Sequence, residues 1–96
     1  MNLQEITNSL RRRVPFDEIP AKIDEVVEFY QPKYFDNAGD FISEVCDTLV
    51  NEFNFNQHDS FSPKEKDELY FYLVDTYGEY IANIYHREKQ TEDNKM

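Results

Sequence analysis

Apolar side chains recur at spacings of three and four along most of the chain, which is the period of an amphipathic helix. Four segments show this period and are expected as helices at about residues 3–13, 18–31, 37–53 and 63–89. The third carries the broadest apolar stripe, which consists of Phe41, Ile42, Val45, Cys46, Leu49, Val50 and Phe53. No segment shows the alternation typical of a strand. The pattern predicts an all-α fold, a small four-helix bundle.

Residues with known positional preferences mark the ends of these helices. Asp17 is the expected N-cap of the second helix, with Pro20 in its first turn. Pro32 should end that helix, because the residue before a proline avoids the helical region. Asp36 or Asn37 should cap the third helix. A polar stretch at residues 54–61, where the period breaks, is expected as a loop.

The fourth helix has the most specific start. The sequence Ser-Pro-Lys-Glu at residues 62–65 supplies a serine N-cap, a proline at the first helical position and a glutamate placed for a capping box. The third and fourth helices carry the largest apolar stripes and should form the centre, with Leu49 and Leu73 buried. Residues 1–90 are expected to form a single domain and residues 91–96 a frayed polar tail.

Composition excludes some classes of protein. The chain has 96 residues, of which 40% are hydrophobic and 16% aromatic, so wholesale disorder is excluded. Twenty acidic residues against ten Lys and Arg give a net charge of −10. This charge argues against direct binding of nucleic acid, which needs positive charge. A basic protein partner is favoured, with simple solubility as the alternative.

The negative charge is concentrated in the middle of the chain. Between Val14 and Pro63 there are eleven acidic residues and only two lysines. Like charges one helical turn apart repel, so these acids do not serve helix stability. An acidic face with a few exposed aromatic residues suits recognition of a basic protein. The candidate partner-binding residues are Glu25, Glu28, Asp40, Glu44, Asp47, Phe71 and Tyr72.

The chain contains residue types that occur in catalytic and metal sites, but their spacing does not match that of any such site. His58 and His86 lie far apart and show no metal-ligand spacing. Residues 36–40 resemble a calcium loop only faintly, because the alternating oxygen ligands and the final glutamate are missing. Two glycines cannot make a phosphate-binding loop. The sequence therefore predicts a non-enzymatic protein with no catalytic residues, metal site or cofactor.

The chain offers few signals about its compartment. Its single cysteine, Cys46, cannot form an intramolecular disulfide and is expected to be a small buried hydrophobic residue. The first residues lack the basic start and apolar run of a signal peptide, and no apolar run approaches the ~20 residues of a membrane span. We expect a cytoplasmic protein, monomer or homodimer, without membrane contact.

Compact, strongly acidic helical chains of this length resemble the immunity proteins that bacteria make against their own nuclease toxins. The resemblance lies in size, acidity and a tyrosine-bearing helix, here at residues 67–72. In the colicin-nuclease group that helix is short and ends at a proline, whereas here it continues to about Tyr85, so no binding residues are carried over. The resemblance implies a non-enzymatic inhibitor that covers the basic substrate surface of a nuclease.

Two other interpretations remain open at the level of sequence. One is a phage- or plasmid-encoded nucleic-acid mimic that blocks a DNA-binding or defence protein. The other is a small helical adaptor or regulatory subunit. Salt-insensitive binding of a partner would favour the adaptor, because an acidic face that acts by charge is weakened by salt.

Overall fold

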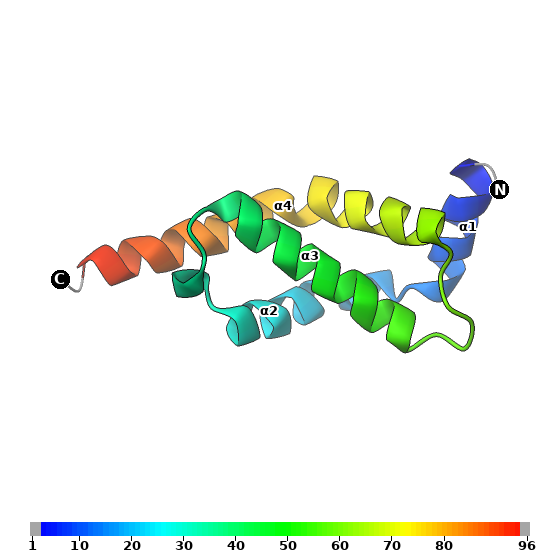
Figure 1. Ribbon diagram of the computed structural model, residues 1–96, viewed down its shortest axis with the longest axis horizontal. Coiled ribbons are helices and arrows are strands. Elements are labelled where there is room, and N and C mark those ends of the chain that lie inside the picture. Colours follow the sequence, from blue (N-terminus) through cyan, green and yellow to red (C-terminus); the bar gives the residue numbers. More distant parts are fainter. Residues whose placement is uncertain (1–2, 95–96) are drawn as a thin grey trace.

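The computed structural model describes residues 3–94, with side chains as far as residue 90, and it is helical almost throughout (Figure 1). The four main helices are α1 (Leu3–Arg13), α2 (Ile19–Tyr30), α3 (Ala38–Phe55) and α4 (Pro63–Asn94). Two short 3₁₀ helices flank α2, η1 (Phe16–Glu18) before it and η2 (Pro32–Tyr34) after it. Residues 3–94 contain no strand. The predicted all-α fold with four helices is confirmed.

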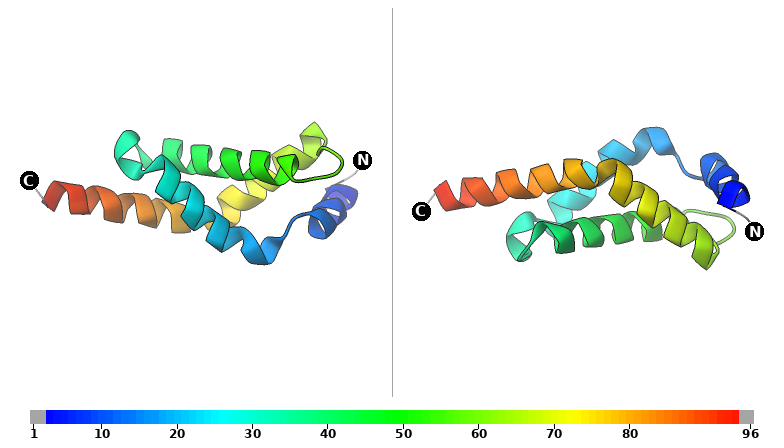
Figure 2. Two further views of the ribbon diagram at one scale, coloured as in Figure 1. Left: turned by 90° about the horizontal axis from the view of Figure 1, so that it is seen from below. Right: turned by 90° about the horizontal axis from the view of Figure 1, so that it is seen from above.

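The long helix α4 organises the molecule. Its first half lies between α1 and α3, and it bends part-way along its length (Figure 2). Its C-terminal end extends past the other helices, which makes the molecule elongated, 52 × 21 × 20 Å (Figure 1). The α3 helix packs against α4 on one side and against α2 on another, and its remaining side faces solvent.

The hydrophobic core lies mainly between α3 and α4, as expected. Leu49 and Leu73 are both fully buried. The other fully buried side chains are Ile19, Ile23, Phe41, Val45, Cys46, Leu69 and Ile81. Because α3 uses one side for this core, its acidic positions are held on the opposite side.

Two of the predicted helix starts are confirmed in atomic detail. Asn37 caps α3, where its Oδ1 accepts a hydrogen bond from the backbone N–H of Asp40 at 2.8 Å. At α4 the capping box is reciprocal. The N–H of Glu65 donates to Ser62 Oγ at 3.2 Å, and the N–H of Ser62 donates to Glu65 Oε1 at 3.0 Å. These caps satisfy backbone donors that the first helical turn leaves without partners.

The expected N-cap at Asp17 is wrong. The chain already turns as η1 at this point, so the residue before α2 is Glu18, whose backbone is helical and whose side chain makes no capping hydrogen bond. Pro20 does lie in the first turn of α2. The helical lead-in takes the place of a side-chain cap at the first residue of α2, because the N–H of Ile19 donates to the carbonyl of Phe16 in η1.

The starts of α2 and α3 lie one residue later than expected, and the C-terminal ends of three helices also differ from the expected ones. The α2 helix ends at Tyr30, where Gln31 has a positive φ of 52° that turns the chain into η2. The α3 helix runs to Phe55, past the expected end at residue 53, and α4 runs to Asn94, past Lys89. Polar residues can prolong a helix whose core face is already packed, since exposed positions need no apolar partner. Residues 95 and 96 of the expected tail lie outside the described residues.

Candidate protein-binding surface

An acidic ridge runs along the solvent side of α3. We define it by Asp40, Glu44 and Asp47, which follow one another at helical spacing and are all exposed. No basic side chain within the described residues lies within 4.0 Å of Glu44 or Asp47. Asp40 differs, because its Oδ2 accepts a hydrogen bond from Asn37 Nδ2 at 3.1 Å and it lies in the first turn of the helix. It therefore also stabilises the start of α3.

A groove between α3 and α4 borders the ridge on one side. Asp47 and Phe71 both line it, so the structure brings these two predicted residues together. Phe71, whose exposure the sequence left open, is 59% exposed in the single chain, and its ring packs edge-on against Tyr70. The hydroxyl groups of Tyr70 and Ser43 lie 3.0 Å apart across the groove. Its other lining residues are Val50, Asn51, Lys66 and Asp67.

A second groove, between α2 and α3, borders the ridge on the other side. Glu25 lines it together with Phe29, which is 79% exposed. Lys22 donates a hydrogen bond to Glu52 at 3.0 Å and lies 3.9 Å from Glu25. The hydrogen bond and charge of Glu52 raise the pKa of Lys22. This cation offsets part of the negative charge here, so the groove is less acidic than the ridge.

The remaining acidic candidate and two further aromatic residues are exposed on α2 and α3. Glu28 is exposed on α2, with no basic side chain within 4.0 Å among the described residues. Sequence reasoning missed Phe29, although it lies off the apolar stripe of α2 and could have been found there. It also missed Phe55, which is 87% exposed at the end of α3, because the helix was expected to stop earlier.

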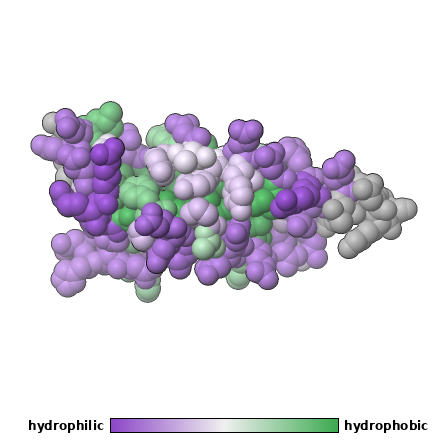
Figure 3. Space-filling view, turned by 180° about the vertical axis from the view of Figure 1, so that it is seen from behind, coloured by the Kyte–Doolittle hydropathy of each residue, from purple (hydrophilic) through white to green (hydrophobic). Residues whose placement is uncertain are grey.

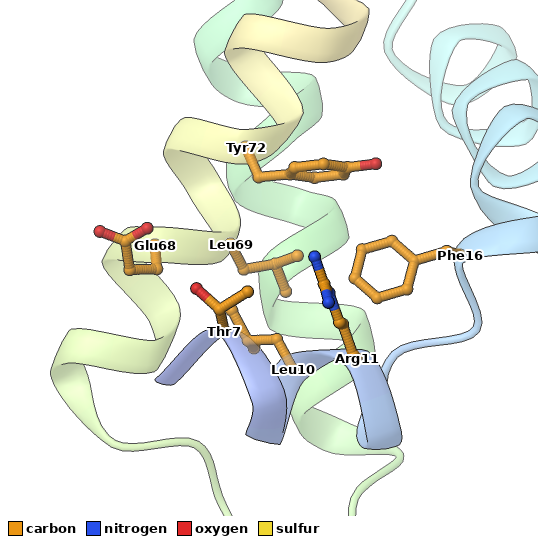
Figure 4. Close-up of a pocket in the computed structure, with 7 residues that line it drawn as sticks. All are labelled: Thr7, Leu10, Arg11, Phe16, Glu68, Leu69 and Tyr72. Carbon is orange, nitrogen blue, oxygen red and sulfur yellow. The ribbon is translucent and has the colours of Figure 1, made fainter. Parts of the chain in front are cut away.

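Tyr72 lies elsewhere, in a pocket of about 310 Å³ between α1, η1 and α4 (Figure 4). We call it the α1–α4 pocket; its lining residues are Thr7, Leu10, Arg11, Phe16, Glu68, Leu69 and Tyr72. The rings of Phe16 and Tyr72 meet edge-on, with centroids 5.3 Å apart. Consecutive helical residues point about 100° apart, so Phe71 and Tyr72 cannot act as one joint anchor.

The face of the molecule opposite α3 is not uniformly polar. Seen from behind, apolar and weakly polar residues gather in its middle, with hydrophilic residues around them (Figure 3).

The structure does not bring all seven candidates together. Five of them lie on α3 or line one of the two grooves beside it: Glu25, Asp40, Glu44, Asp47 and Phe71. Glu28 is exposed on α2 but lines neither groove, and Tyr72 belongs to the α1–α4 pocket.

A buried polar cluster ties α1 to the start of α4, and sequence reasoning missed it. Glu65 Oε2 accepts hydrogen bonds from Ser9 Oγ at 2.6 Å and from Arg13 Nη1 at 3.1 Å. Arg13 also bonds to Gln57 and lies over the ring of Phe61. Burial raises the pKa of the Glu65 carboxyl, but the hydrogen bonds from Ser9 and Ser62 and the charge of Arg13 outweigh it and lower the pKa overall.

Three further properties of the described residues concern metal binding, the thiol of Cys46 and membrane crossing. No group of three or more His, Cys, Asp and Glu residues in that part of the chain could hold a metal ion. Cys46 is fully buried, and burial raises the pKa of its thiol to about 12, so it is not a reactive thiolate at neutral pH. None of the helices in residues 3–94 combines the length and apolar character needed to cross a bilayer.

A comparison of the chain with family models, curated proteins and solved structures finds no match. A function therefore has to be inferred from the shape and charge of the surface itself.

Proposed function

We propose that the protein is a non-enzymatic inhibitor that covers a basic protein surface with its α2–α3–α4 face, and that its partner is a bacterial nuclease toxin. The observation that carries this proposal is the acidic ridge, where Glu44 and Asp47 are exposed and have no basic side chain within 4.0 Å among the described residues. Carboxylates left without cations retain their full attraction for an incoming basic surface.

The two grooves beside the ridge supply aromatic contact area, which the charged side chains of the ridge do not. Exposed Phe71 lies in one groove and exposed Phe29 in the other. Large aromatic side chains contribute buried contact area, and a few such residues carry most of the affinity at typical interfaces. Charges on the ridge would accelerate encounter and orient the partner, while the phenylalanines would slow its dissociation.

A nuclease is a suitable class of partner for physical reasons. An enzyme that holds a phosphate backbone must present a basic surface. Carboxylates at helical spacing can occupy that surface, and the bound helices then exclude substrate by bulk and by repulsion. The inhibitor needs no chemistry of its own, because it acts by covering the surface that the substrate would occupy.

The test is the association rate of the protein with a basic nuclease encoded beside its gene, measured at several salt concentrations. The double variant Glu44→Lys with Asp47→Lys should slow association by about tenfold or more at low salt and flatten its dependence on salt. This pair is preferable to a change at Asp40, because Asp40 also bonds to the cap of α3.

The matched control is Glu79→Lys with Glu88→Lys. Both residues are exposed on α4 and the change in net charge is the same, but neither lies on the ridge. The control should retain most of the wild-type rate. Equal slowing by both variants would show that only the overall charge matters, and unchanged binding by the ridge variant would refute a role for the ridge. Inhibition of the nuclease must fall in parallel with binding.

A further inference from the structure

The α1–α4 pocket has the chemical character of a binding site that the acidic face does not use. Its floor consists of Leu10 and Leu69, which are buried, and its wall of the edge-on rings of Phe16 and Tyr72. A volume of about 310 Å³ is at the lower end of the range of known ligand pockets, roughly 300–1,000 Å³. This is room for one or two side chains.

The polar residues at its rim have hydrogen-bonding capacity to spare. Within the described residues, the side chains of Thr7, Arg11 and Glu68 and the hydroxyl of Tyr72 make no hydrogen bond or ion pair. The rim is also polarised. Arg11 lies on one side of Leu69, next to the Phe16 ring, and Glu68 lies on the other side (Figure 4). A donor and an acceptor therefore flank an apolar floor.

We propose that this pocket binds an apolar side chain, phenylalanine or leucine, within an exposed peptide segment of a protein partner. A peptide residue carries its side chain between a carbonyl oxygen and an N–H. The carbonyl would accept from the Arg11 guanidinium and the N–H would donate to the Glu68 carboxylate. The hydrogen-bond donor and acceptor at the rim and the apolar floor together match this occupant.

Exposure of the lining residues favours a peptide over a small metabolite. Tyr72 is 40% exposed and Arg11 is exposed, whereas small-molecule sites bury most of the ligand surface. An occupant of this pocket keeps one side open to solvent, as a chain that enters and leaves across the rim would. The pocket shares no lining residue with the two grooves beside the acidic ridge, so it is independent of the proposed function.

The experiment titrates the isotope-labelled full chain with acetyl-Gly-Phe-Gly-amide and follows backbone amide shifts by NMR. Saturable shifts are expected at Thr7, Arg11 and Leu69, with a dissociation constant on the order of 1 mM for so small a probe. Acetyl-Gly-Ala-Gly-amide should give no saturable shift there. Arg11→Ala should weaken binding of the phenylalanine peptide by about tenfold.

Arg12→Ala is the matched control, since Arg12 is the exposed neighbour of Arg11 on α1 and does not line the pocket. It should change the affinity by less than about twofold. Equal effects of the two arginine variants would overturn the assigned role of the rim. Absence of saturable shifts in the wild type would overturn the site.

Two other occupants are separate outcomes, and each would overturn the peptide proposal. Free phenylalanine that binds as tightly as the blocked peptide would show a site for a small zwitterion. Self-association in sedimentation that is lost in Arg11→Ala would show that a second copy of the chain fills the pocket. The Glu44→Lys, Asp47→Lys variant should bind the probe normally, so failure here and failure of the inhibitor proposal can be told apart.

Discussion

At the scale of single residues, Glu65 shows how hydrogen bonds can offset the cost of burying a carboxylate. Its side chain is only 5% exposed, yet Ser9, Ser62 and Arg13 all donate hydrogen bonds to it. Each of these bonds favours the charged form, and together they offset the cost of removing the carboxylate from water. The cluster joins α1 to the start of α4, which would otherwise meet mainly through apolar contacts.

Glu65→Gln should destabilise the protein by about 1–3 kcal/mol at neutral pH, because it removes the charge that Arg13 and Ser9 are placed to meet. The folded-state pKa lies below the unfolded value of about 4.3, so this contribution is present above that pH and is lost as the pH falls through the folded pKa. Urea unfolding at a series of pH values measures it. The difference between wild type and variant should shrink in acid.

The control for this prediction is Glu79→Gln, on the same helix but exposed. Its stability should follow the wild-type pH profile. If the stability of Glu65→Gln followed the wild-type pH profile as well, the stability difference from wild type would not shrink in acid. The carboxylate would then not be stabilised by its surroundings.

The core offers a simpler prediction. Leu49→Ala and Leu73→Ala should each cost about 2–5 kcal/mol, because both side chains are fully buried between α3 and α4. Leu3→Ala removes the same atoms from a side chain that is 61% exposed and should cost less than about 0.5 kcal/mol. Thermal unfolding followed by circular dichroism compares the three. A similar cost at all three positions would mean that the core has been placed wrongly.

At the scale of helices, the sequence carries local information well. The period of apolar residues predicted all four main helices. A cap at Asp36 or Asn37 and another at Ser62 were predicted because capping depends on side chains a few residues apart, and the structure has Asn37 and Ser62 as the caps. The wrong prediction of a cap at Asp17 also came from local residue type. A capping residue type was recognised, but a preceding 3₁₀ turn made the cap unnecessary.

Contacts between distant residues could not be predicted in this way. Arg13 and Glu65 are far apart in the sequence, and helical spacing says nothing about which ends of two helices meet. For the same reason the pattern indicated that Phe71 is exposed but not that Asp47 lies beside it, nor that Tyr72 faces α1. The acidic ridge was predictable because all of its members belong to one helix.

Gly78 gives a prediction at this scale. It lies inside α4, and a Cβ added to it would meet only Val74 Cγ1, at an ordinary contact distance of 3.9 Å. Gly78→Ala should therefore raise the free energy of unfolding by about 0.5–1 kcal/mol, since alanine restricts the unfolded chain more than glycine does. Thermal unfolding would show this as a rise of a few degrees in Tm.

Gly39→Ala is the matched comparison for that variant. A Cβ at this position would lie 3.2 Å from Oδ1 of Asn37, the atom that caps α3. The crowded cap should cancel most of the gain. Equal stabilisation by both variants would mean that the cap can move aside, and a loss of stability in Gly78→Ala would indicate a close approach to this glycine that the structure does not show.

At the scale of the whole molecule, a net charge of −10 on a body only about 20 Å across has opposite effects on the stability of the fold and on the recognition of a basic partner. Repulsion among unpaired carboxylates weakens the folded state, while the same field draws in a basic partner. If the ridge exists for binding, changes that relieve the repulsion should stabilise the protein and impair its function. If the ridge serves only solubility, the same changes should stabilise the protein and leave its function intact.

Glu44→Lys with Asp47→Lys should accordingly raise the free energy of unfolding by a few tenths of a kcal/mol at low salt, because each lysine replaces a repulsive neighbour on α3. Wild-type stability should rise by a similar amount when added salt shortens the Debye length from about 30 Å to about 8 Å, and the variant should respond less. Urea unfolding at both salt concentrations measures this. A variant that is both more stable and a weaker binder would show that the carboxylates are kept for recognition at the expense of stability. A variant that is less stable at low salt would mean that Glu44 and Asp47 hold the fold together, and that their exposure does not mark an interface.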